Sequence, residues 1–259
     1  MKIDVNLFNR YHAAKLLRKQ TLDNLTIWNY ASQCTHEHAW DAVTTLARGL
    51  ITLLDGTIHA RSFAKFWNLG EDPGPSLETL PKENPVITLK EDGFLGISYV
   101  HNGCVKIASR GSFTSEYAVW ATEWLHKNNP DATHGILEPE QYTFVFEILY
   151  PHRRIVVDNS ARTGLVLLAA IETDTGKELP RNELEVLAKM FRWPIVSVFP
   201  TNTIEDCVNI SKALKGTEQE GFVAHYVNAG LRVKIKGGDY CKIHKIVTQL
   251  TEKRVWEIL

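Results

Sequence analysis

A lysine followed by two acidic residues and a glycine, Lys90-Glu91-Asp92-Gly93, is the part of the chain best suited to covalent chemistry. It stands where the apolar residues 85–89 end and the apolar residues 94–100 begin. A lysine amine attacks an electrophile in its neutral form, yet at its reference pKa of about 10.4 it is almost fully protonated at neutral pH. Partial burial and neighbouring cations lower this pKa, so a lysine nucleophile needs other basic residues nearby. The same four residues also suit an ordinary solvated lysine ahead of a hairpin.

Further charged groups follow in a fixed order, each at the end or on one face of a β-prone apolar segment. They are Ser109-Arg110-Gly111-Ser112, then Glu147 within residues 144–148 running into 154–158, then Glu220-Gly221, then Lys234 and Lys236 within residues 231–236. Upstream lie Arg48-Gly49-Leu50-Ile51 and residues 61–68, which contain Arg61 and Lys65. Neither a G-x-x-x-x-G-K-[ST] loop nor a G-x-G-x-x-G turn between a strand and a helix is present, so side-chain cations must hold any phosphate.

In this order the groups resemble motifs I, Ia, III, IV and V of the covalent nucleotidyltransferases. That superfamily comprises ATP-dependent DNA and RNA ligases and messenger-RNA capping enzymes. The upstream segments resemble those that precede the active lysine in RNA ligases of the phage RNA ligase 1 type. The resemblance covers roughly residues 45–240, and its specificity lies in the ordered set, because each motif alone is weak.

The resemblance implies an ATP-dependent RNA ligase that joins 5′-phosphate and 3′-hydroxyl ends. The lysine would take AMP from ATP, pass it to the 5′-phosphate as an RNA-adenylate, and release it when the 3′-hydroxyl attacks. ATP as AMP donor and Mg²⁺ or Mn²⁺ are the implied cofactors. RNA strands are the implied partners, together with a kinase or phosphatase that prepares their ends, in RNA repair such as that of transfer RNA.

The resemblance also assigns roles to single residues. The catalytic group would be Lys90 as the AMP-bearing nucleophile, with Lys234 and Lys236. Arg110 and Glu147 would contact the ribose. The nucleotide-binding set as a whole would be Arg48, Arg61, Lys65, Leu89, Arg110, Glu147, Glu220, Lys234 and Lys236, in which Arg61, Lys65 and Arg48 reach the β- and γ-phosphates. A metal would be held, directly or through water, by Asp92, Glu147 and Glu220.

Local patterns predict an α+β fold with mainly antiparallel sheets and flanking helices, the architecture of a ligase adenylylation domain. Apolar spacing predicts helices, and β-prone runs bounded by turn residues predict strands. An Asn102-Gly103 turn predicts a hairpin between residues 97–100 and 105–108. The predicted helices cover residues 5–18, 115–127, 183–191 and 204–214; the predicted strands cover 50–54, 142–149, 154–158, 164–171, 195–199, 221–227 and 231–235.

Composition agrees with one nucleotidyltransferase domain. The chain has 259 residues, 44% of them hydrophobic and 23% charged, with a net charge of −1. We expect a single domain over residues 1–259, with residues 1–40 as a helical N-terminal appendage and no separate C-terminal domain. The four cysteines form no C-x-x-C pair and predict reduced thiols. With no apolar run near the roughly 18 residues of a membrane span, we expect the cytoplasm, or the host cytoplasm for a viral chain.

Several alternatives stay open at this point. The chemistry also fits a DNA ligase, a GTP-using capping enzyme, or a module that binds nucleotides or RNA ends without catalysis. Glu147 alone could be an edge-strand carboxylate paired with Arg153 or Arg154. Lys234 and Lys236 alternate with apolar neighbours, a pattern that any half-solvated strand gives.

Overall fold

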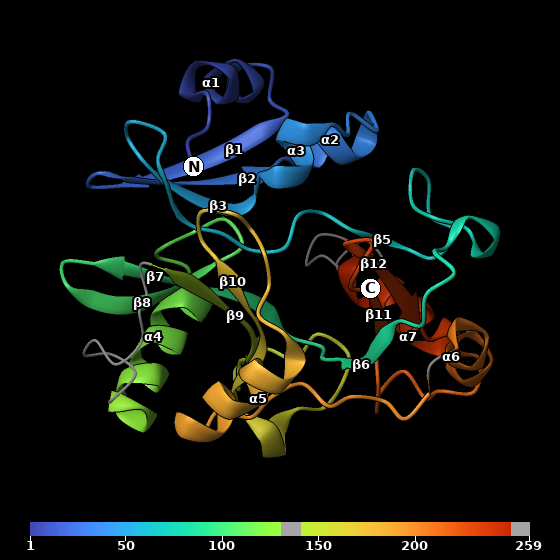
Figure 1. Ribbon diagram of the computed structural model, residues 1–259. Helices are drawn as coiled ribbons and strands as arrows, with labels where there is room; N and C mark the ends of the chain where they lie inside the picture. The colour runs from blue at the N-terminus through green and yellow to red at the C-terminus, as the bar shows by residue number, and fades with distance from the viewer. Residues whose placement is uncertain (131–140, 202, 250–259) are drawn as a thin grey trace, which may run out of the picture. The chain divides into compact units, whose positions relative to one another are not determined.

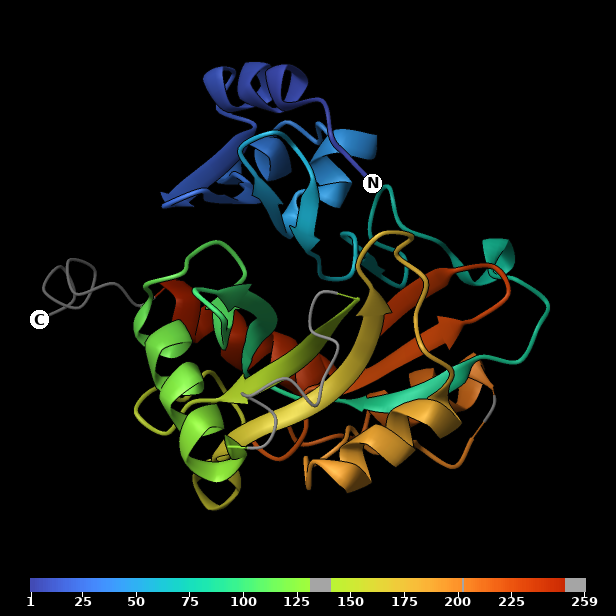
Figure 2. The same ribbon diagram turned by 60° about the vertical axis from the view of Figure 1, so that its left-hand side comes forward.

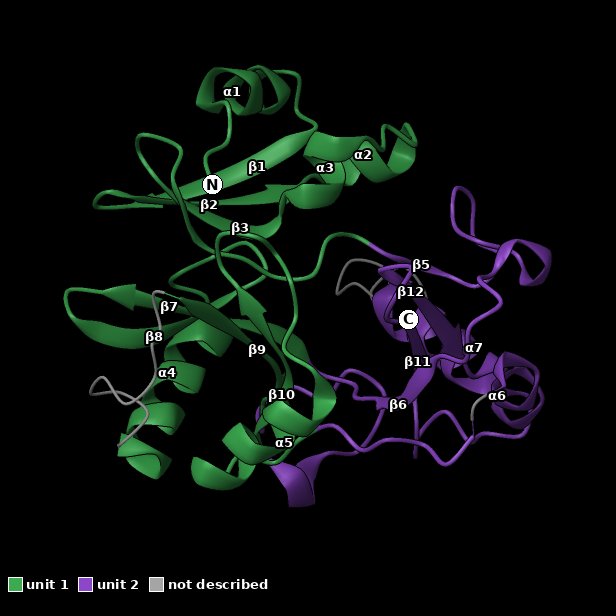
Figure 3. Ribbon diagram, in the orientation of Figure 1, with its two compact units in different colours: residues 1–65, 94–150, 164–195 green, residues 66–93, 151–163, 196–259 purple. Residues whose placement is uncertain are grey.

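The computed structural model describes residues 1–130, 141–201 and 203–249. These residues form two compact units that interleave along the sequence (Figure 3). Unit 1 comprises Met1–Lys65, Phe94–Tyr150 and Gly164–Ile195, and unit 2 comprises Phe66–Gly93, Pro151–Thr163 and Val196–Leu259. No helix within the described ranges is both long and apolar enough to cross a bilayer.

The N-terminal part of unit 1 is a four-stranded antiparallel meander in the order β1-β2-β3-β4, drawn in blue in Figure 1. Its elements are α1 (Val5–Ala13), β1 (Leu17–Leu22), β2 (Leu25–Tyr30), α2 (Ser32–His36), α3 (Ala42–Leu46), β3 (Arg48–Leu53) and β4 (Ile58–Ala60). The predictions of a helix to residue 18 and of a helical appendage over 1–40 are wrong. Lys15 adopts a φ of 61°, which ends the helix, and the following residues form a strand that pairs with β2.

The second sheet of unit 1 has the order β10-β9-β7-β8 and is also antiparallel. Its strands are β7 (Phe94–His101), β8 (Cys104–Ser109), β9 (Tyr142–Leu149) and β10 (Gly164–Glu172). The predicted hairpin is confirmed: Asn102 and Gly103 both have positive φ, 52° and 74°, as a two-residue hairpin turn requires. Helix α4 (Glu116–Asn128) confirms the helix predicted over residues 115–127, and the Ser115 side chain caps it by accepting a hydrogen bond from the Ala118 amide.

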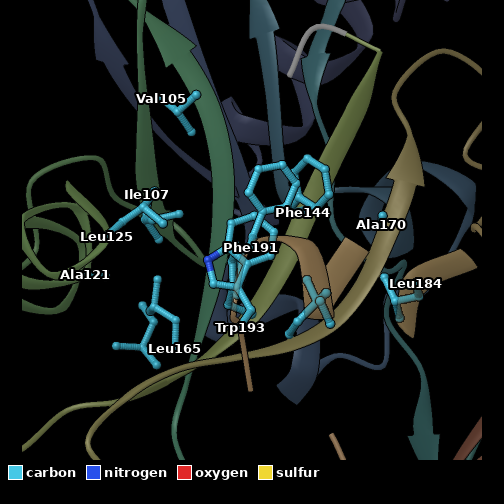
Figure 4. Packing of buried hydrophobic residues seen from close by; sticks show 14 residues of the cluster. Val105, Ile107, Ala121, Leu125, Phe144, Leu165, Ala170, Leu184, Phe191 and Trp193 are labelled. Atoms are coloured by element: carbon cyan, nitrogen blue, oxygen red, sulfur yellow. The ribbon is translucent and has the colours of Figure 1, made fainter. Parts of the chain in front are cut away.

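Helices α4 and α5 (Arg181–Met190) cover one face of this sheet (Figures 1 and 2). Figure 4 shows the core between them, where the rings of Phe144, Phe191 and Trp193 gather. The Trp193 centroid lies 5.4 Å from that of Phe144 and 4.9 Å from that of Phe191. Large aromatic side chains gain most from burial, so this cluster fixes both helices against the sheet. The opposite face packs on the N-terminal meander through residues that include Ile27, Ile51, Ile97, Tyr99 and Phe113.

Unit 2 contains a third sheet in the order β5-β12-β11-β6, in which the β5–β12 pair alone is parallel. Its strands are β5 (Trp67–Asn68), β6 (Val86–Lys90), β11 (Gly221–Tyr226) and β12 (Leu231–Lys236). The unit also has helices α6 (Ile204–Ser211) and α7 (Gly238–Gln249) and the 3₁₀ turns Leu77–Thr79 and Ser160–Arg162. The three sheets with their helices confirm the predicted α+β class.

Two predicted strands are wrong. In the segment 154–158, the amides of Val156 and Val157 donate to the side chain of Asp92 instead of to a neighbouring strand. In the segment 195–199, pairing is limited to isolated bridges such as the one between Val198 and Thr88. Backbone donors in a β-prone run can be satisfied by a side chain as well as by a strand, which sequence periodicity does not show.

Candidate active site: a lysine cluster and an arginine cluster

Strand register in unit 2 places two of the predicted catalytic lysines beside one carboxylate. Gly221 of β11 pairs with Lys90 of β6 on one side and with Lys236 of β12 on the other. Glu220 directly precedes this position. Its Oε2 accepts a hydrogen bond from Lys90 Nζ at 2.7 Å, and its Oε1 lies 2.8 Å from Lys236 Nζ. We refer to Lys90, Lys236 and Glu220 as the lysine cluster.

Glu220 is an ionised, deeply buried carboxylate. Its side chain is 3% exposed, against 19% for Lys90 and 24% for Lys236. Burial alone would raise the pKa of Glu220, but the charges and hydrogen bonds of the two ammonium groups outweigh burial and hold the pKa below its ordinary value. Two cations share one anion, so the cluster carries net positive charge and suits an additional anionic ligand such as a phosphate.

A glycine makes this close approach possible. Gly221 has a φ of +147°, and a Cβ atom there would clash with the carbonyl oxygen of Ile235 and lie 2.9 Å from the Cα of Lys236. Only a glycine fits this backbone conformation next to the facing strand. Gly221 therefore lets β11, which begins directly after Glu220, pack closely against β12.

Lys234 lies on the same face of β12 as Lys236, because residues two apart in a strand share a face, and Val233 and Ile235 are buried on the other face. Its ammonium donates to the carbonyl oxygen of Phe66 at 2.9 Å and lies 4.4 Å from the centroid of the Phe66 ring. The structure thus places Lys234 beside the segment that precedes β5. The strand predicted over residues 231–235 is thus confirmed, with apolar and basic side chains on opposite faces.

The carboxylate of Asp92 accepts hydrogen bonds from other residues of unit 2. It is 5% exposed, its Oδ2 accepts from the amides of Val156 and Val157 at 2.8 and 2.7 Å, and its Oδ1 accepts from the Tyr240 hydroxyl at 2.6 Å. Its neighbour Glu91 forms a two-pronged ion pair with Arg162, at 2.8 and 3.2 Å. Tyr240 and Arg162 were absent from the predicted site residues, because neither lies in one of the motifs that carry the resemblance.

Leu89, a predicted nucleotide contact, packs against the apolar core of unit 2 around Ile87, Phe222 and Val233. Its amide donates to the carbonyl oxygen of Ser197 at 2.9 Å. These contacts hold the end of β6 in place next to Lys90.

Unit 1 contains a second charged group, built around Arg48. The Arg48 guanidinium donates to the hydroxyl of Ser62 at 3.3 Å and to the carbonyl oxygen of Phe63 at 3.4 Å. Burial lowers its pKa, and the charge of Arg110 adds to this effect, while Tyr30 and Glu147 oppose it. Arginine nevertheless stays protonated in proteins, so the group keeps its charge.

Arg110 completes this second group. It donates to the Tyr30 hydroxyl at 3.2 Å, and its guanidinium carbon lies 5.2 Å from the centroid of the Tyr30 ring. Glu147 lies on β9, an inner strand between β7 and β10, so the alternative of an edge-strand carboxylate is wrong. We refer to Arg48, Arg110, Glu147 and Tyr30 as the arginine cluster; Tyr30 was absent from the predicted set.

Arg61 and Lys65 make contacts of their own within unit 1. Burial lowers the pKa of Arg61, whose side chain donates to the carbonyl oxygen of Thr173 at 3.4 Å and lies against Gly176. The ammonium of Lys65 lies 5.1 Å from the ring centroid of Trp40. Both residues remain candidates for phosphate contacts on the strength of the sequence resemblance.

The predicted metal ligands were tested against the donor groups present. Among the residues that the structure describes, no group of three or more His, Cys, Asp or Glu side chains is arranged to hold a metal ion. Magnesium usually keeps several waters and needs only one or two carboxylates, so Glu220 and Glu147 still suit a hydrated ion. Asp92 suits it poorly, because its oxygens accept from two backbone amides and a buried tyrosine hydroxyl, whereas the partners of Glu220 are flexible lysine side chains that can move aside for an ion.

Comparison with solved structures identifies the fold. The chain is similar to an archaeal ATP-dependent RNA ligase, with a TM-score of 0.63 and 15% identity over 92% of this chain and 62% of that one. It is equally similar to a protein of Aquifex aeolicus provisionally assigned as an ATP-dependent DNA ligase, with a TM-score of 0.63 and 16% identity over 89% of this chain and 62% of that one. At such identities the likeness concerns the fold, which is that of a ligase nucleotidyltransferase domain.

Sequence comparison identifies the family. Residues 46–240 match the family model described as RNA ligase, and this range includes the lysine cluster. The chain therefore belongs to the RNA ligase family. A curated protein of Thermovibrio ammonificans, provisionally assigned as an RNA ligase, is 28% identical over 202 residues, which are 75% of this chain and 51% of that protein. The chain thus spans about half the length of this curated relative.

Proposed function

We propose that the chain is an ATP-dependent RNA ligase that joins 5′-phosphate and 3′-hydroxyl RNA ends, with Lys90 as the residue that carries AMP. The observation that carries the proposal is the lysine cluster, in which Lys90 and Lys236 share the buried carboxylate of Glu220. Family membership supports the reaction class. The two similar solved proteins, which are ATP-dependent by name, support ATP as the donor.

In the first step, the Nζ of Lys90 attacks the α-phosphorus of ATP, the bond to pyrophosphate breaks, and Nζ loses its proton. Before this attack the Lys90 ammonium must lose a first proton to become a neutral amine, and lowering its pKa by about three so that this happens near neutral pH corresponds to roughly 4 kcal/mol. The nearby ammonium of Lys236 favours that loss, whereas Glu220 opposes it. Because its pKa is depressed, Glu220 is a weak base; its part is to hold both lysines in position.

In the second step, a 5′-phosphate oxygen attacks the phosphorus of lysyl-AMP, and the phosphorus–nitrogen bond breaks to give an RNA-adenylate. In the third step, a 3′-hydroxyl attacks the 5′-phosphorus, loses its proton, and expels AMP as the phosphodiester forms. Charge develops on phosphate oxygens in every step, so the same cations serve all three. Lys236 and Lys234 are the residues of unit 2 that we assign to this task.

The remaining residues would bind the nucleotide. We assign Arg110 and Glu147 to the ribose, and Arg61, Lys65 and Arg48 to the β- and γ-phosphates, each on the strength of the motif it occupies. Hydrated Mg²⁺ or Mn²⁺ would be held by Glu220 of unit 2, and Glu147 of unit 1 is a second candidate ligand by its motif. Such an ion supplies positive charge that stabilises the phosphates as charge develops on them.

RNA strands with 5′-phosphate and 3′-hydroxyl ends are the proposed substrates, in RNA repair that includes transfer RNA. An end-preparing kinase or phosphatase would act before the ligase wherever an RNA end lacks one of these groups. We place this activity in the cytoplasm.

Incubation with α-labelled ATP or GTP and magnesium, followed by denaturing electrophoresis, tests the proposal. Wild-type protein should retain label from ATP, Lys90→Ala should retain none, and Lys212→Ala, which removes an exposed lysine of unit 2, should behave as wild type. Label from GTP alone would identify a capping-type enzyme, and no label from either nucleotide would favour a binding module.

The labelled protein can then be chased with a 5′-phosphorylated strand. Transfer of AMP to RNA in preference to DNA of the same sequence supports an RNA ligase. Equal or greater transfer to nicked DNA would identify a DNA ligase instead.

A further inference from the structure

The buried residue Asp92 is linked to both lysines of the lysine cluster, to Lys90 along the backbone and to Lys236 through Tyr240. Asp92 follows Lys90 by two residues and accepts three hydrogen bonds on its carboxylate, from the Val156 and Val157 amides and from the Tyr240 hydroxyl. Its backbone carbonyl accepts a fourth, from the Asn159 side chain at 2.9 Å. Every atom of this arrangement belongs to unit 2.

Tyr240 is bound at both ends of its side chain. It lies in the first turn of α7 and is 2% exposed, so its hydroxyl needs a partner, which Asp92 provides. Its ring lies beneath the ammonium of Lys236, with 5.2 Å between the nitrogen and the ring centroid. One tyrosine therefore contacts both the aspartate that follows Lys90 and the lysine that shares Glu220 with it.

These contacts form a closed circuit. It runs from Lys90 through Glu220 to Lys236, from Lys236 to the ring of Tyr240, from the Tyr240 hydroxyl to Asp92, and back along the backbone to Lys90. A long lysine side chain is flexible, and a circuit of this kind restricts both lysines to one arrangement. Displacement of a reacting group by about 1 Å can cost a hundredfold in rate.

We propose that Asp92 and Tyr240 are positioning residues that fix Lys90 and Lys236 relative to each other, and that Asp92 is not a metal ligand. The proposal rests on the proposed function, since it assigns Lys90 as the nucleophile. It replaces the metal role that the sequence resemblance implied for Asp92, because both carboxylate oxygens accept hydrogen bonds from backbone amides or from a buried hydroxyl, which cannot move aside as a flexible lysine side chain can.

Three variants separate the contacts. Tyr240→Phe keeps the ring beneath Lys236 and removes the hydrogen bond to Asp92, Asp92→Asn keeps the size of the side chain and removes its charge, and the double variant combines them. Tyr226→Phe is the matched control, because Tyr226 is also a buried tyrosine of unit 2, at 3% exposure.

The first measurement is the single-turnover rate of lysyl-AMP formation at saturating ATP and magnesium. Tyr240→Phe should lower this rate about tenfold with little change in the ATP concentration for half-maximal rate, and Tyr226→Phe should leave it unchanged. The double variant should be no slower than Asp92→Asn alone, since both changes break one contact. Wild-type rates in Tyr240→Phe, with or without a lower melting temperature, would overturn the positioning role.

Magnesium dependence separates the two roles of Asp92. A positioning residue changes the maximal rate without changing the magnesium concentration for half-maximal rate. If Asp92→Asn instead requires at least tenfold more magnesium while Tyr240→Phe does not, Asp92 is a metal ligand and the proposal is wrong.

A second readout does not depend on ligase activity. Reductive methylation without ATP, followed by peptide mass analysis, measures the reactivity of Lys90 against that of the exposed Lys212. Loss of the circuit should increase the ratio of Lys90 to Lys212 labelling at least threefold in Tyr240→Phe and leave it unchanged in Tyr226→Phe. If wild-type protein forms no lysyl-AMP, the proposed function fails, and this ratio still decides whether Asp92 and Tyr240 position Lys90.

Discussion

The lysine cluster of unit 2 and the arginine cluster of unit 1 hold their cations in different ways. In the lysine cluster, the ammonium groups of Lys90 and Lys236 bind directly to the buried carboxylate of Glu220. In the arginine cluster, the Arg48 and Arg110 side chains donate to neutral oxygens, those of a serine, a backbone carbonyl and a tyrosine. The first arrangement is a charge network, and the second is a scaffold for permanent charges.

The difference matches what each side chain can do. A lysine amine can lose its proton and become a nucleophile, so its charge depends on the groups around it. A guanidinium keeps its charge even when burial lowers its pKa, as it does for Arg48. We infer that the lysine cluster performs the proposed chemistry, whereas the arginine cluster offers a fixed positive surface.

The strongest test of this difference is to exchange lysine for arginine in one cluster and arginine for lysine in the other. Lys90→Arg should abolish lysyl-AMP formation, at least a thousandfold, because an arginine at this position keeps its proton. Arg48→Lys should lower the rate only about tenfold, because a lysine there still supplies charge, although it loses the planar donor geometry. Labelling with α-labelled ATP measures both variants.

One outcome would contradict this difference between the two clusters. Equally small losses in Lys90→Arg and Arg48→Lys would show that both clusters supply only charge. Circular dichroism of each variant serves as the control for folding.

Removal of the carboxylate should have the next largest effect. Glu220→Gln leaves the ammonium groups of Lys90 and Lys236 close together without their shared anion, and loss of one partner from a buried charge pair costs about 2 to 5 kcal/mol. We expect lysyl-AMP formation to fall about a hundredfold and thermal stability to decrease. Glu147→Gln, the matched change in the arginine cluster, should cost less stability, and a greater loss there would reverse the comparison.

The glycines beside the two clusters provide a test of backbone geometry. Gly221 follows Glu220 and Gly49 follows Arg48, and both have positive φ, +147° and +75°. A Cβ atom at Gly221 would meet the backbone of β12, whereas one at Gly49 would meet the flexible end of the Ile97 side chain and, at 3.2 Å, the carbonyl oxygen of Arg110.

Gly221→Ala should therefore destabilise the chain by about 3 kcal/mol or more, and Gly49→Ala by about 1 to 3 kcal/mol. Gly103→Ala is the control, because its φ is +74° but nothing lies within 4 Å of the added atom; it should cost about 1 kcal/mol. Urea unfolding of the three variants gives the order. If Gly221→Ala costs no more than Gly103→Ala, close packing against β12 does not determine the residue.

Local signals allowed much of the fold to be predicted from the sequence. The Asn102-Gly103 turn, the capped helix α4 and strand β9 depend on neighbours within a few residues, and all three were found. The start of strand β1, Leu17 and Arg18, was mistaken for the end of a helix because apolar and basic residues continue beyond Ala13, where the true amphipathic helix ends. Segment 154–158 was mistaken for a strand because its hydrogen-bond acceptor, Asp92, lies more than sixty residues away in the sequence.

The candidate site shows the same limit. The motif residues Lys90, Glu220 and Lys236 could be predicted, and their meeting around one carboxylate follows from strand register. Tyr240 and Tyr30 could not, since nothing in their sequence neighbourhoods distinguishes them from core tyrosines. Contacts such as these are decided by tertiary packing, which one sequence does not show.

The smallest expected effect is the pH dependence that Glu220 gives to stability. Its pKa in the folded chain is below the ordinary value of 4.5, so its ionised form favours folding. This contribution is complete above the unfolded pKa and is lost as the pH falls through the lower, folded pKa. The free energy of unfolding of wild type should therefore exceed that of Glu220→Gln at pH 7, and the difference should shrink below about pH 4.5.

Urea titrations of both proteins between pH 3 and 8 measure this difference directly. Glu147→Gln, compared in the same way, reports whether the pH response belongs to the lysine cluster in particular. A difference between wild type and Glu220→Gln that stays constant down to pH 3 would mean that charge pairing with Lys90 and Lys236 does not stabilise the fold. The carboxylate would then matter for the arrangement of the lysines alone, and the contrast between a charge network and a scaffold of fixed charges would concern reactivity and not stability.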